Sequence, residues 1–258
     1  MTNVVAIIQA RTGSSRLPRK VLLPLGEKEV LAHVYSRLQE CSFISEIVVA
    51  TSTDPSDNDI ESLCKRDNIN IFRGNLLDVL DRYFQSASFY NADIIVRITA
   101  DCPLFDPSIV DIVIKDFLSN PCDLLTLTDD APDGLDVAIF SMSSLTLAWE
   151  QAELPSEREH VGPYIESNPH IFKIRRNSFF REWNVGHIRI TLDEPSDYTL
   201  LKIIFERLKP KDRTYKNIIQ MIAEDCKLQN INSNILRNEG YIKSLEQDSA
   251  YLAKKNKL

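Results

Sequence analysis

The stretch VVAIIQARTGSSRLPRK, residues 4–20, places an uninterrupted apolar run directly before a segment rich in cations. A continuous apolar run of this length is typical of a strand that is buried on both faces. The next segment with a helical stripe begins at Val30, so residues 9–20 are expected to form a loop at the carboxyl end of that strand. Open α/β sheets bind their ligands at this end. The stretch therefore predicts an α/β fold with a ligand site after its first strand.

Outward from this stretch, strand-like and helix-like segments alternate through the first half of the chain. Apolar runs predict strands over residues 47–50, 69–72, 94–96 and 124–127, and helical stripes lie between them over residues 30–41, 57–67, 76–90 and 107–118. Such alternation predicts a mostly parallel sheet with helices on both faces. The segments that follow Ile8, Ala50 and Ile98 are therefore expected to carry the chemistry.

The second half of the chain is less regular. We expect strands over residues 135–140, 170–176 and 188–192, and helices over residues 145–152, 156–167, 195–208 and 215–226. Pro163 is expected to kink the second of these helices. No internal repeat or low-complexity linker divides the sequence. The pattern predicts one α/β domain over residues 1–210 and a C-terminal helical extension over residues 211–258.

Composition and charge restrict the class of protein. The 258 residues carry a formal net charge of −7, which disfavours a non-specific nucleic-acid binder, because such proteins present a basic face. No apolar run approaches the length of a membrane span or of a signal segment. The five cysteines form no CxxC pair, which is typical of a reduced chain. We therefore expect a cytoplasmic protein that binds neither nucleic acid nor membrane.

The loop after the first strand gathers cations in an otherwise acidic protein. Its cationic residues are Arg11, Arg16, Arg19 and Lys20. Arginine grips phosphate oxygens in pairs and lysine supplies a point charge, while Gly13 and Ser14 allow close backbone approach and a hydroxyl contact. The GxxxxGK[ST] and GxGxxG patterns are absent. The loop therefore indicates an anion-binding site of another kind, and the alternative is a solvated basic loop.

Two carboxylates follow predicted strands. Asp101 comes after the strand that ends at Ile98, and Asp193 comes after the apolar segment 188–192. Carboxylates in this position are suited to a hard cation such as Mg²⁺. The alternative for Asp101 is a turn or helix-capping role, which aspartate often has at such junctions. Asp197, at the start of the next predicted helix, is expected to stabilise the helix dipole.

Together these segments resemble the cytidylyltransferase family typified by the spore-coat-polysaccharide biosynthesis proteins. That family is related to the synthetases that make CMP-activated sialic acid and CMP-activated ketodeoxyoctulosonate. The matching pieces are AIIQARTGSSRLPRKVLLPLG (6–26), IVVATS (47–52), FRGNLLDVLDRYFQSA (72–87), VRITADCPLFDP (96–107), PDGLDVAIFS (132–141), EREHVGPYI (157–165), IRITLDEPSDY (188–198) and RNEGYIKSLEQD (237–248). The resemblance covers almost the whole chain. It departs at Ala138, where the family commonly has Glu, and at Gly162, where it has Thr.

The resemblance implies a three-layer α/β/α, Rossmann-like fold of the nucleotide-diphospho-sugar-transferase kind, with a mixed, mostly parallel sheet. It implies transfer of CMP from CTP to a small acidic acceptor, with release of pyrophosphate and Mg²⁺ as cofactor. It also implies a homodimer and a C-terminal extension that is ordered and packed on the domain. Surface polysaccharide or glycan precursor biosynthesis is the expected setting.

The resemblance also assigns residues by position in this sequence. The catalytic residues would be Arg11, Arg16, Lys20 and Asp101, and the metal ligands would be Asp101 and Asp193. Gly13, Ser14 and Thr51 would bind the nucleotide. The other residues that we expect to bind substrate are Ala10, Arg97, Asp136, Arg158 and His160, and of these Arg158 and His160 supply positive charge for an acidic acceptor.

Two other functions remain open on the residues. A glycosyltransferase of the same fold would consume a nucleotide sugar, but Asp101-Cys102-Pro103 lacks the second acid of a DxD motif. A non-catalytic subunit of a polysaccharide assembly would not need Arg16, Lys20 and the two aspartates. Pyrophosphate release from nucleoside triphosphates distinguishes these functions.

Overall fold

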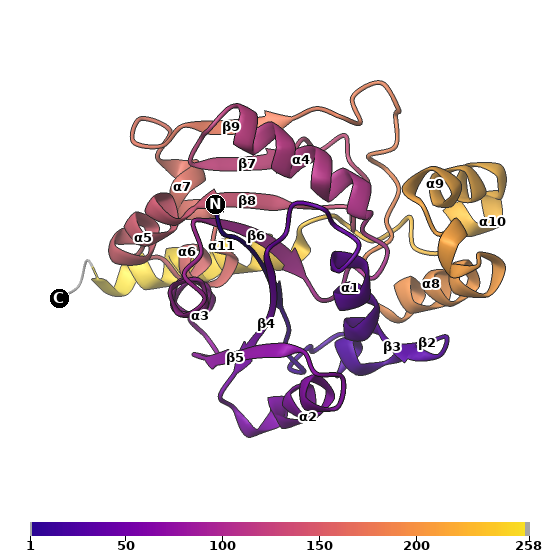
Figure 1. Cartoon of the computed structure of the whole chain (residues 1–258), viewed down its shortest axis with the longest axis horizontal. Helices are drawn as coiled ribbons and strands as arrows, with labels where there is room; N and C mark the ends of the chain where they lie inside the picture. Colours follow the sequence, from indigo (N-terminus) through magenta and orange to yellow (C-terminus); the bar gives the residue numbers. More distant parts are fainter. Residues whose placement is uncertain (1, 256–258) are drawn as a thin grey trace.

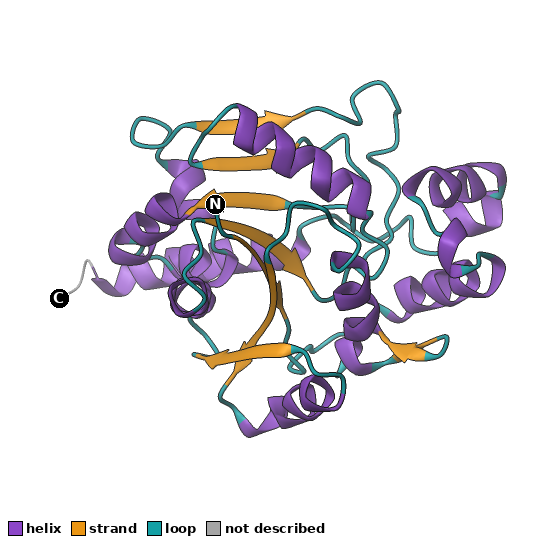
Figure 2. Cartoon of the chain, viewed as in Figure 1, coloured by secondary structure: helices purple, strands orange, loops and turns teal. Residues whose placement is uncertain are grey.

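A seven-stranded mixed sheet forms the centre of the computed structural model, which describes residues 2–255 (Figure 1). In spatial order its strands are β5 (Asn70–Gly74), β4 (Glu46–Ser52), β1 (Val4–Gln9), β6 (Ile94–Thr99), β8 (Ala138–Ser141), β7 (Leu124–Leu127) and β9 (Ile174–Asn177). A short hairpin of β2 (Pro24–Leu25) and β3 (Lys28–Glu29) stands apart from this sheet. Figure 2 shows the strands with helices packed on both sides. The predicted three-layer α/β/α fold is confirmed.

The order of the strands locates a crevice between β1 and β6. Strand β1 pairs in parallel with β4 on one side and with β6 on the other, whereas β8 runs antiparallel to both β6 and β7. The chain builds outward from β1 through β4 to β5 and then returns to β6 on the other side of β1. Such a reversal leaves a crevice at the carboxyl ends of the two strands. The loops after β1 and β6 therefore lie side by side at this edge of the sheet.

Two apolar cores lie on the two faces of the sheet. Helices α1 (Val30–Leu38), α2 (Asn58–Arg66) and α4 (Pro107–Ser119) pack on one face. Helices α3 (Val79–Phe89), α5 (Met142–Gln151) and α7 (Pro163–Ser167) pack on the other. Along β1, Ala6 and Ile8 enter the first core while Val5 and Ile7 enter the second, as expected for a strand buried on both faces. The continuous apolar runs of the sequence therefore correspond to the central strands of the sheet.

Helix starts follow local sequence signals. Pro107 occupies the first turn of α4, where a missing N–H costs nothing, and the Asp106 side chain accepts a hydrogen bond from Ser108 N at 2.9 Å. The Asp78 side chain likewise accepts from Asp81 N at 2.9 Å and begins α3. The predicted helix 156–167 is instead two helices, α6 (Pro155–His160) and α7. The break comes at Val161, whose φ of 71° a continuous helix cannot contain.

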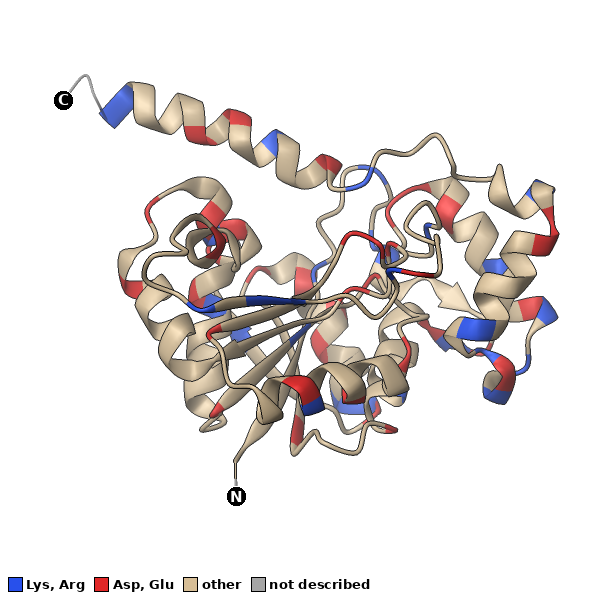
Figure 3. Ribbon diagram, turned by 90° about the horizontal axis from the view of Figure 1, so that it is seen from above, with Lys and Arg blue, Asp and Glu red and all other residues tan. Residues whose placement is uncertain are grey.

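Residues after the sheet form helices on its flank. They are α8 (Pro195–Arg207), α9 (Tyr215–Glu224), α10 (Cys226–Gln229) and α11 (Glu239–Lys255). Helix α11 packs against α6, where Ser156 Oγ donates to Asp248 at 2.6 Å. In Figure 3, α11 lies along one edge of the molecule, with lysines in its last turn. Residues 256–258 of the expected extension lie outside the described residues. Among residues 2–255, no helix is both long and apolar enough to cross a membrane.

The predicted strand over residues 188–192 is wrong. Its alternation is real, because Ile188, Ile190 and Leu192 are buried. However, its backbone bonds to loops: Ile190 N donates to Asp133 O at 2.7 Å, and Leu192 N donates to Asp101 O at 2.8 Å. Among the described residues, its single β-bridge joins Arg189 to Asp133, which lies in a loop. The segment therefore wedges between the two loops that carry Asp101 and Asp133.

Candidate active site

The loop after β1 and the loop after β6 meet through Lys20. The Lys20 ammonium donates to Asp101 Oδ2 at 2.5 Å and to Asp193 Oδ1 at 2.6 Å. Asp101 follows β6 by two residues, and Asp193 arrives from the wedged segment before α8. The two aspartates predicted to be metal ligands thus converge on one cation, which is supplied here by the predicted phosphate-binding loop.

A buried aspartate holds the phosphate-binding loop in place. Asp57 is inaccessible to solvent and accepts hydrogen bonds from Thr12 N at 2.7 Å and Thr12 Oγ1 at 2.8 Å. Its other oxygen accepts from Ser52 Oγ, at the end of β4. The loop then turns at Arg19, whose φ is 59°, into the short helix that contains Lys20. Asp57 therefore ties the cationic loop to the neighbouring strand before the loop reaches the aspartates.

Burial and charge act in opposite directions at the Lys20 cluster. Burial on its own lowers the pKa of Lys20, but the Asp101 and Asp193 carboxylates outweigh it and raise that pKa. Burial on its own raises the pKa of Asp101, but the Lys20 ammonium outweighs it and brings that pKa down to about 2. Both groups are consequently charged at neutral pH. The cluster therefore places one ammonium between two carboxylates.

Arg16 is surrounded by carboxylates. Its guanidinium lies 2.6 Å from Glu239 in the first turn of α11, 3.3 Å from Glu194 and 3.4 Å from Asp193. The loop residue predicted to grip phosphate is thus held by acids from two distant parts of the chain. The C-terminal helix therefore reaches the rim of the predicted site.

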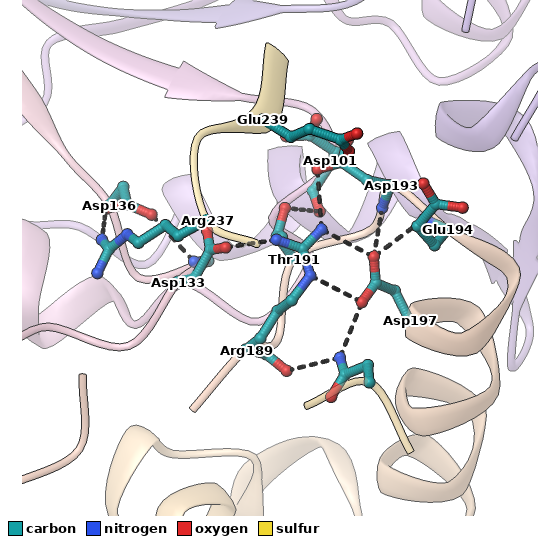
Figure 4. Close-up of polar contacts among 12 residues, drawn as sticks. Asp101, Asp133, Asp136, Arg189, Thr191, Asp193, Glu194, Asp197, Arg237 and Glu239 are labelled. Atoms are coloured by element: carbon teal, nitrogen blue, oxygen red, sulfur yellow. Dashed lines mark hydrogen bonds and ion pairs between the residues drawn. The ribbon is translucent and has the colours of Figure 1, made fainter. Parts of the chain in front are cut away.

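Arg189 joins the acids behind Asp193 (Figure 4). Its guanidinium donates to Asp197 at 2.9 Å through two nitrogens, to Asp193 Oδ2 at 2.9 Å and to Asp133 Oδ2 at 2.5 Å. Asp197 also accepts from the backbone N–H groups of Asp193 and Glu194, both at 2.9 Å. Asp197 therefore lies in the first turn of α8, where an acid stabilises the helix dipole as predicted, and in addition pairs with a buried arginine.

The donor set fits a divalent cation that completes its shell from a ligand. Asp101 and Asp193 present hard carboxylate oxygens to the point where the Lys20 ammonium lies. Within residues 2–255, no group of three His, Cys, Asp or Glu side chains forms a closed metal cage. Mg²⁺ is commonly held by one or two carboxylates together with substrate phosphates and water. The residues present therefore suit Mg²⁺ bound with a phosphate ligand.

The opposite wall of the crevice carries cations with few acidic partners. Arg97 on β6 donates to Gln9 Oε1 at 3.2 Å, and within residues 2–255 its buried Nε has no hydrogen-bond partner. Arg11 is 40% exposed and lies 3.5 Å from Glu159. His160 Nε2 lies 2.9 Å from Ser244 Oγ of α11, and burial lowers the pKa of its imidazole. Arg11 and Arg97 are thus available to an anion.

The remaining predicted site residues occupy different environments. Ala10 and Thr51 are buried, and Ser14 Oγ accepts from Leu17 N within the loop. A Cβ added at Gly13 would meet no atom within 4 Å beyond its chain neighbours. Asp136 accepts from Gly134 N at 3.0 Å and pairs with Arg237 at 2.7 Å. Arg158 binds Asp78 and the Trp149 carbonyl, and so braces α3 against α5.

Sequence reasoning missed several residues that shape the site. They are Asp57, Arg189, Asn232 and Glu239. Asn232 Nδ2 donates to Asp197 Oδ1 at 2.8 Å and to Arg189 O at 3.1 Å. None of these residues comes directly after a predicted strand, so their position relative to strand ends did not single them out. Arg189 carried one signal, since an arginine alternating with buried apolar residues requires an acidic partner.

The chain is similar to known proteins along most of its length. A family model described as "Cytidylyltransferase" matches residues 5–256. An uncharacterised protein of Methanocaldococcus jannaschii is 36% identical over 92% of this chain and 97% of its own length. The spore coat polysaccharide biosynthesis protein SpsF of Bacillus subtilis is 30% identical over 80% of this chain and 88% of its own length.

Solved structures show the same fold. A cytidylyltransferase from Leptospira borgpetersenii has a TM-score of 0.84 and 35% identity, and the match covers 89% of this chain and 98% of that one. A CMP:2-keto-3-deoxy-manno-octonic acid synthetase complexed with CTP has a TM-score of 0.61 and 18% identity, over 80% of this chain and 99% of that one, and supports the fold alone. Because the family model spans almost the whole sequence and two relatives of at least 35% identity align along most of their length, this chain belongs to the cytidylyltransferase family of nucleotidyltransferases.

Proposed function

We propose that this protein transfers CMP from CTP to a small acidic acceptor and releases pyrophosphate. The observation that carries the proposal is the convergence of Asp101, Asp193 and Lys20 at the crevice between β1 and β6. Membership of the cytidylyltransferase family supports the reaction class. The name of the SpsF relative supports a role in glycan or surface polysaccharide precursor synthesis.

The residues divide the work of the reaction. Little covalent chemistry falls to the protein when an acceptor oxygen attacks the α-phosphorus, so positioning and charge neutralisation dominate. Arg11, Arg16 and Lys20 would neutralise the triphosphate, and Asp101 and Asp193 would hold Mg²⁺. When bound, Mg²⁺ supplies neutralisation of phosphate charge and aligns the reacting oxygens. Without a nucleotide, the Lys20 ammonium lies between the two aspartates and reduces the repulsion between them. When a triphosphate binds, the ammonium would contact a phosphate oxygen, and the aspartates would contact the metal ion.

The open wall of the crevice suits the acceptor. Arg97 has a guanidinium nitrogen without a hydrogen-bond partner among residues 2–255, and Arg11 has one carboxylate neighbour, Glu159. His160 lies 4.0 Å from the same Glu159. An ionised carboxylate, phosphate or phosphonate would bind such groups through charge-assisted hydrogen bonds. Ala10, Gly13, Ser14 and Thr51 would border the nucleotide. Asp136 and Arg158 would support the walls through Arg237 and Asp78.

Pyrophosphate release tests the proposal. The assay pairs each of the four nucleoside triphosphates with a panel of nonulosonic acids, sugar phosphates and phosphonates, with Mg²⁺ or with EDTA. We expect release that requires CTP, one acceptor class and the metal. Equal release from all four nucleotides, or none with any acceptor while a nucleotide sugar is consumed, would contradict the proposal.

A further inference from the structure

We propose that Arg189 is a positioning residue that orients Asp193 for binding of a divalent cation. The inference rests on the proposed function, because it takes Asp193 to be a ligand of that cation. It adds a residue that touches neither nucleotide nor metal and acts only through Asp193.

The guanidinium of Arg189 contacts one carboxylate oxygen of Asp193 and not the other. Nη2 donates to Asp193 Oδ2 at 2.9 Å. Asp193 Oδ1 turns the other way, toward the Lys20 ammonium at 2.6 Å and the Arg16 guanidinium at 3.4 Å. A carboxylate anchored through one oxygen cannot rotate freely, so Oδ1 faces the crevice. A cation would therefore meet an oxygen whose direction is already set.

Arg189 is itself held from several directions. It is 8% exposed, and its other nitrogens bind Asp197, which is inaccessible to solvent, and Asp133 on the opposite loop. Gly134 allows that loop to approach, because a Cβ there would lie 2.6 Å from Thr191 N. Asn232 closes the network from the C-terminal segment. Contacts from three segments thus hold the guanidinium in place, and the guanidinium in turn holds the Asp193 carboxylate.

Only an arginine can make these contacts together. Its planar fork offers five N–H donors in fixed directions, whereas lysine offers a single ammonium. Asp193 lies outside any regular strand, so no sheet ladder fixes its backbone. Its backbone N–H depends on Asp197, and its side chain depends on Arg189. Arg189→Lys should therefore keep a charge beside Asp197 while releasing Asp193.

Binding of Mn²⁺, a paramagnetic substitute for Mg²⁺, tests this role without turnover. We would titrate Mn²⁺ into the full-length protein with CTP present and measure free Mn²⁺ by electron paramagnetic resonance. Arg189→Lys should weaken Mn²⁺ binding by about tenfold while thermal unfolding stays close to the wild type. Asp133→Asn, which removes one anchor of Arg189 without leaving an isolated buried charge, should weaken it about threefold and provides the test if Arg189→Lys does not fold.

The matched control is Arg175→Lys, because Arg175 also pairs with an aspartate, Asp116 at 2.8 Å, on β9 and α4 away from the crevice. It should leave Mn²⁺ binding unchanged. Asp193→Asn separates the two ideas. If Asp193→Asn binds Mn²⁺ as the wild type does, the proposed function loses its metal ligand. If Asp193→Asn loses Mn²⁺ binding while folded Arg189→Lys and Asp133→Asn both retain wild-type affinity, the positioning role of Arg189 is overturned.

Discussion

The two walls of the crevice differ in how their cations are matched. On the wall formed by Lys20, Arg16 and Arg189, every cation contacts at least two carboxylates. On the wall formed by Arg11 and Arg97, one arginine has a single carboxylate at 3.5 Å and the other has a buried nitrogen without a partner among residues 2–255. On the first wall a divalent cation could take the place of the Lys20 ammonium between the Asp101 and Asp193 carboxylates. An unsaturated wall gains most from an anion.

The largest expected effect comes from Asp101→Asn on the saturated wall. An amide offers Mg²⁺ only a neutral dipole, so turnover should fall roughly a thousandfold, which corresponds to about 4 kcal/mol of transition-state stabilisation. Pyrophosphate release and a thermal melting curve on the same purified variant measure this. Asp225→Asn, which alters a cap at the start of α10, is the control and should stay active. Near-normal turnover in Asp101→Asn would show that Asp101 has a turn or capping role and does not bind the metal ion.

Arg97→Met should have the second largest effect, on the unsaturated wall. It removes a guanidinium that we expect to contact the acceptor anion, so kcat/KM for the acceptor should fall about ten- to a hundredfold. The affinity for CTP, measured separately, should change little. Arg207→Met, in an exposed pair with Asp225, is the control. A loss that appears in CTP affinity instead would assign Arg97 to the nucleotide and undo the division between the walls.

Glu239→Gln should have a smaller effect of opposite sign. The Glu239 carboxylate lies 2.6 Å from the Arg16 guanidinium, which we expect to bind the triphosphate. Both side chains are partly exposed. Removing this competing charge should lower the KM for CTP by a few fold, as expected for a partly exposed ion pair. Steady-state kinetics in CTP measure the change. A raised KM would show that Glu239 supports Arg16 rather than competes for it.

His160→Gln should produce the smallest effect, on the pH dependence of stability. Burial lowers the pKa of His160 below its ordinary 6.5, so the unfolded chain binds this proton more readily than the folded protein does. The free energy of unfolding should therefore fall as the pH drops through this window, and the fall should be shallower in the variant. Urea unfolding at pH 7.5 and pH 5.5 compares the two proteins. Identical slopes would mean that His160 does not titrate in this way.

Much of the fold and part of the site could be predicted from the sequence. The strands β1, β4 and β6 are buried on both faces, so they appear as apolar runs, and residues at their ends fall at one edge of the sheet. Lys20 and Asp101 were found for that reason. The segment 188–192 alternates because one side is buried, and alternation reports burial whether or not a neighbouring strand is present.

The support of the site could not be predicted in this way. Glu239 and Asn232 reach the cluster from a segment that begins after α10, and only tertiary packing brings them to Arg16 and Asp197. Arg189 binds three aspartates from two separate segments, and no spacing in the sequence specifies that set. Arg158 belongs to a motif that resembles the family, yet its contacts are with Asp78 and a backbone carbonyl. Such side-chain networks depend on how loops approach one another.

The most direct test of the central claim is calorimetric titration of nucleotide into the full-length protein, with Mg²⁺ and with EDTA. If Asp101 and Asp193 hold a metal ion that also binds the triphosphate, CTP should bind at least tenfold more tightly with Mg²⁺ than without it. ATP, GTP and UTP should bind more weakly under the same conditions. Equal CTP affinity with Mg²⁺ and with EDTA, or equal affinity for all four nucleotides, would contradict the account.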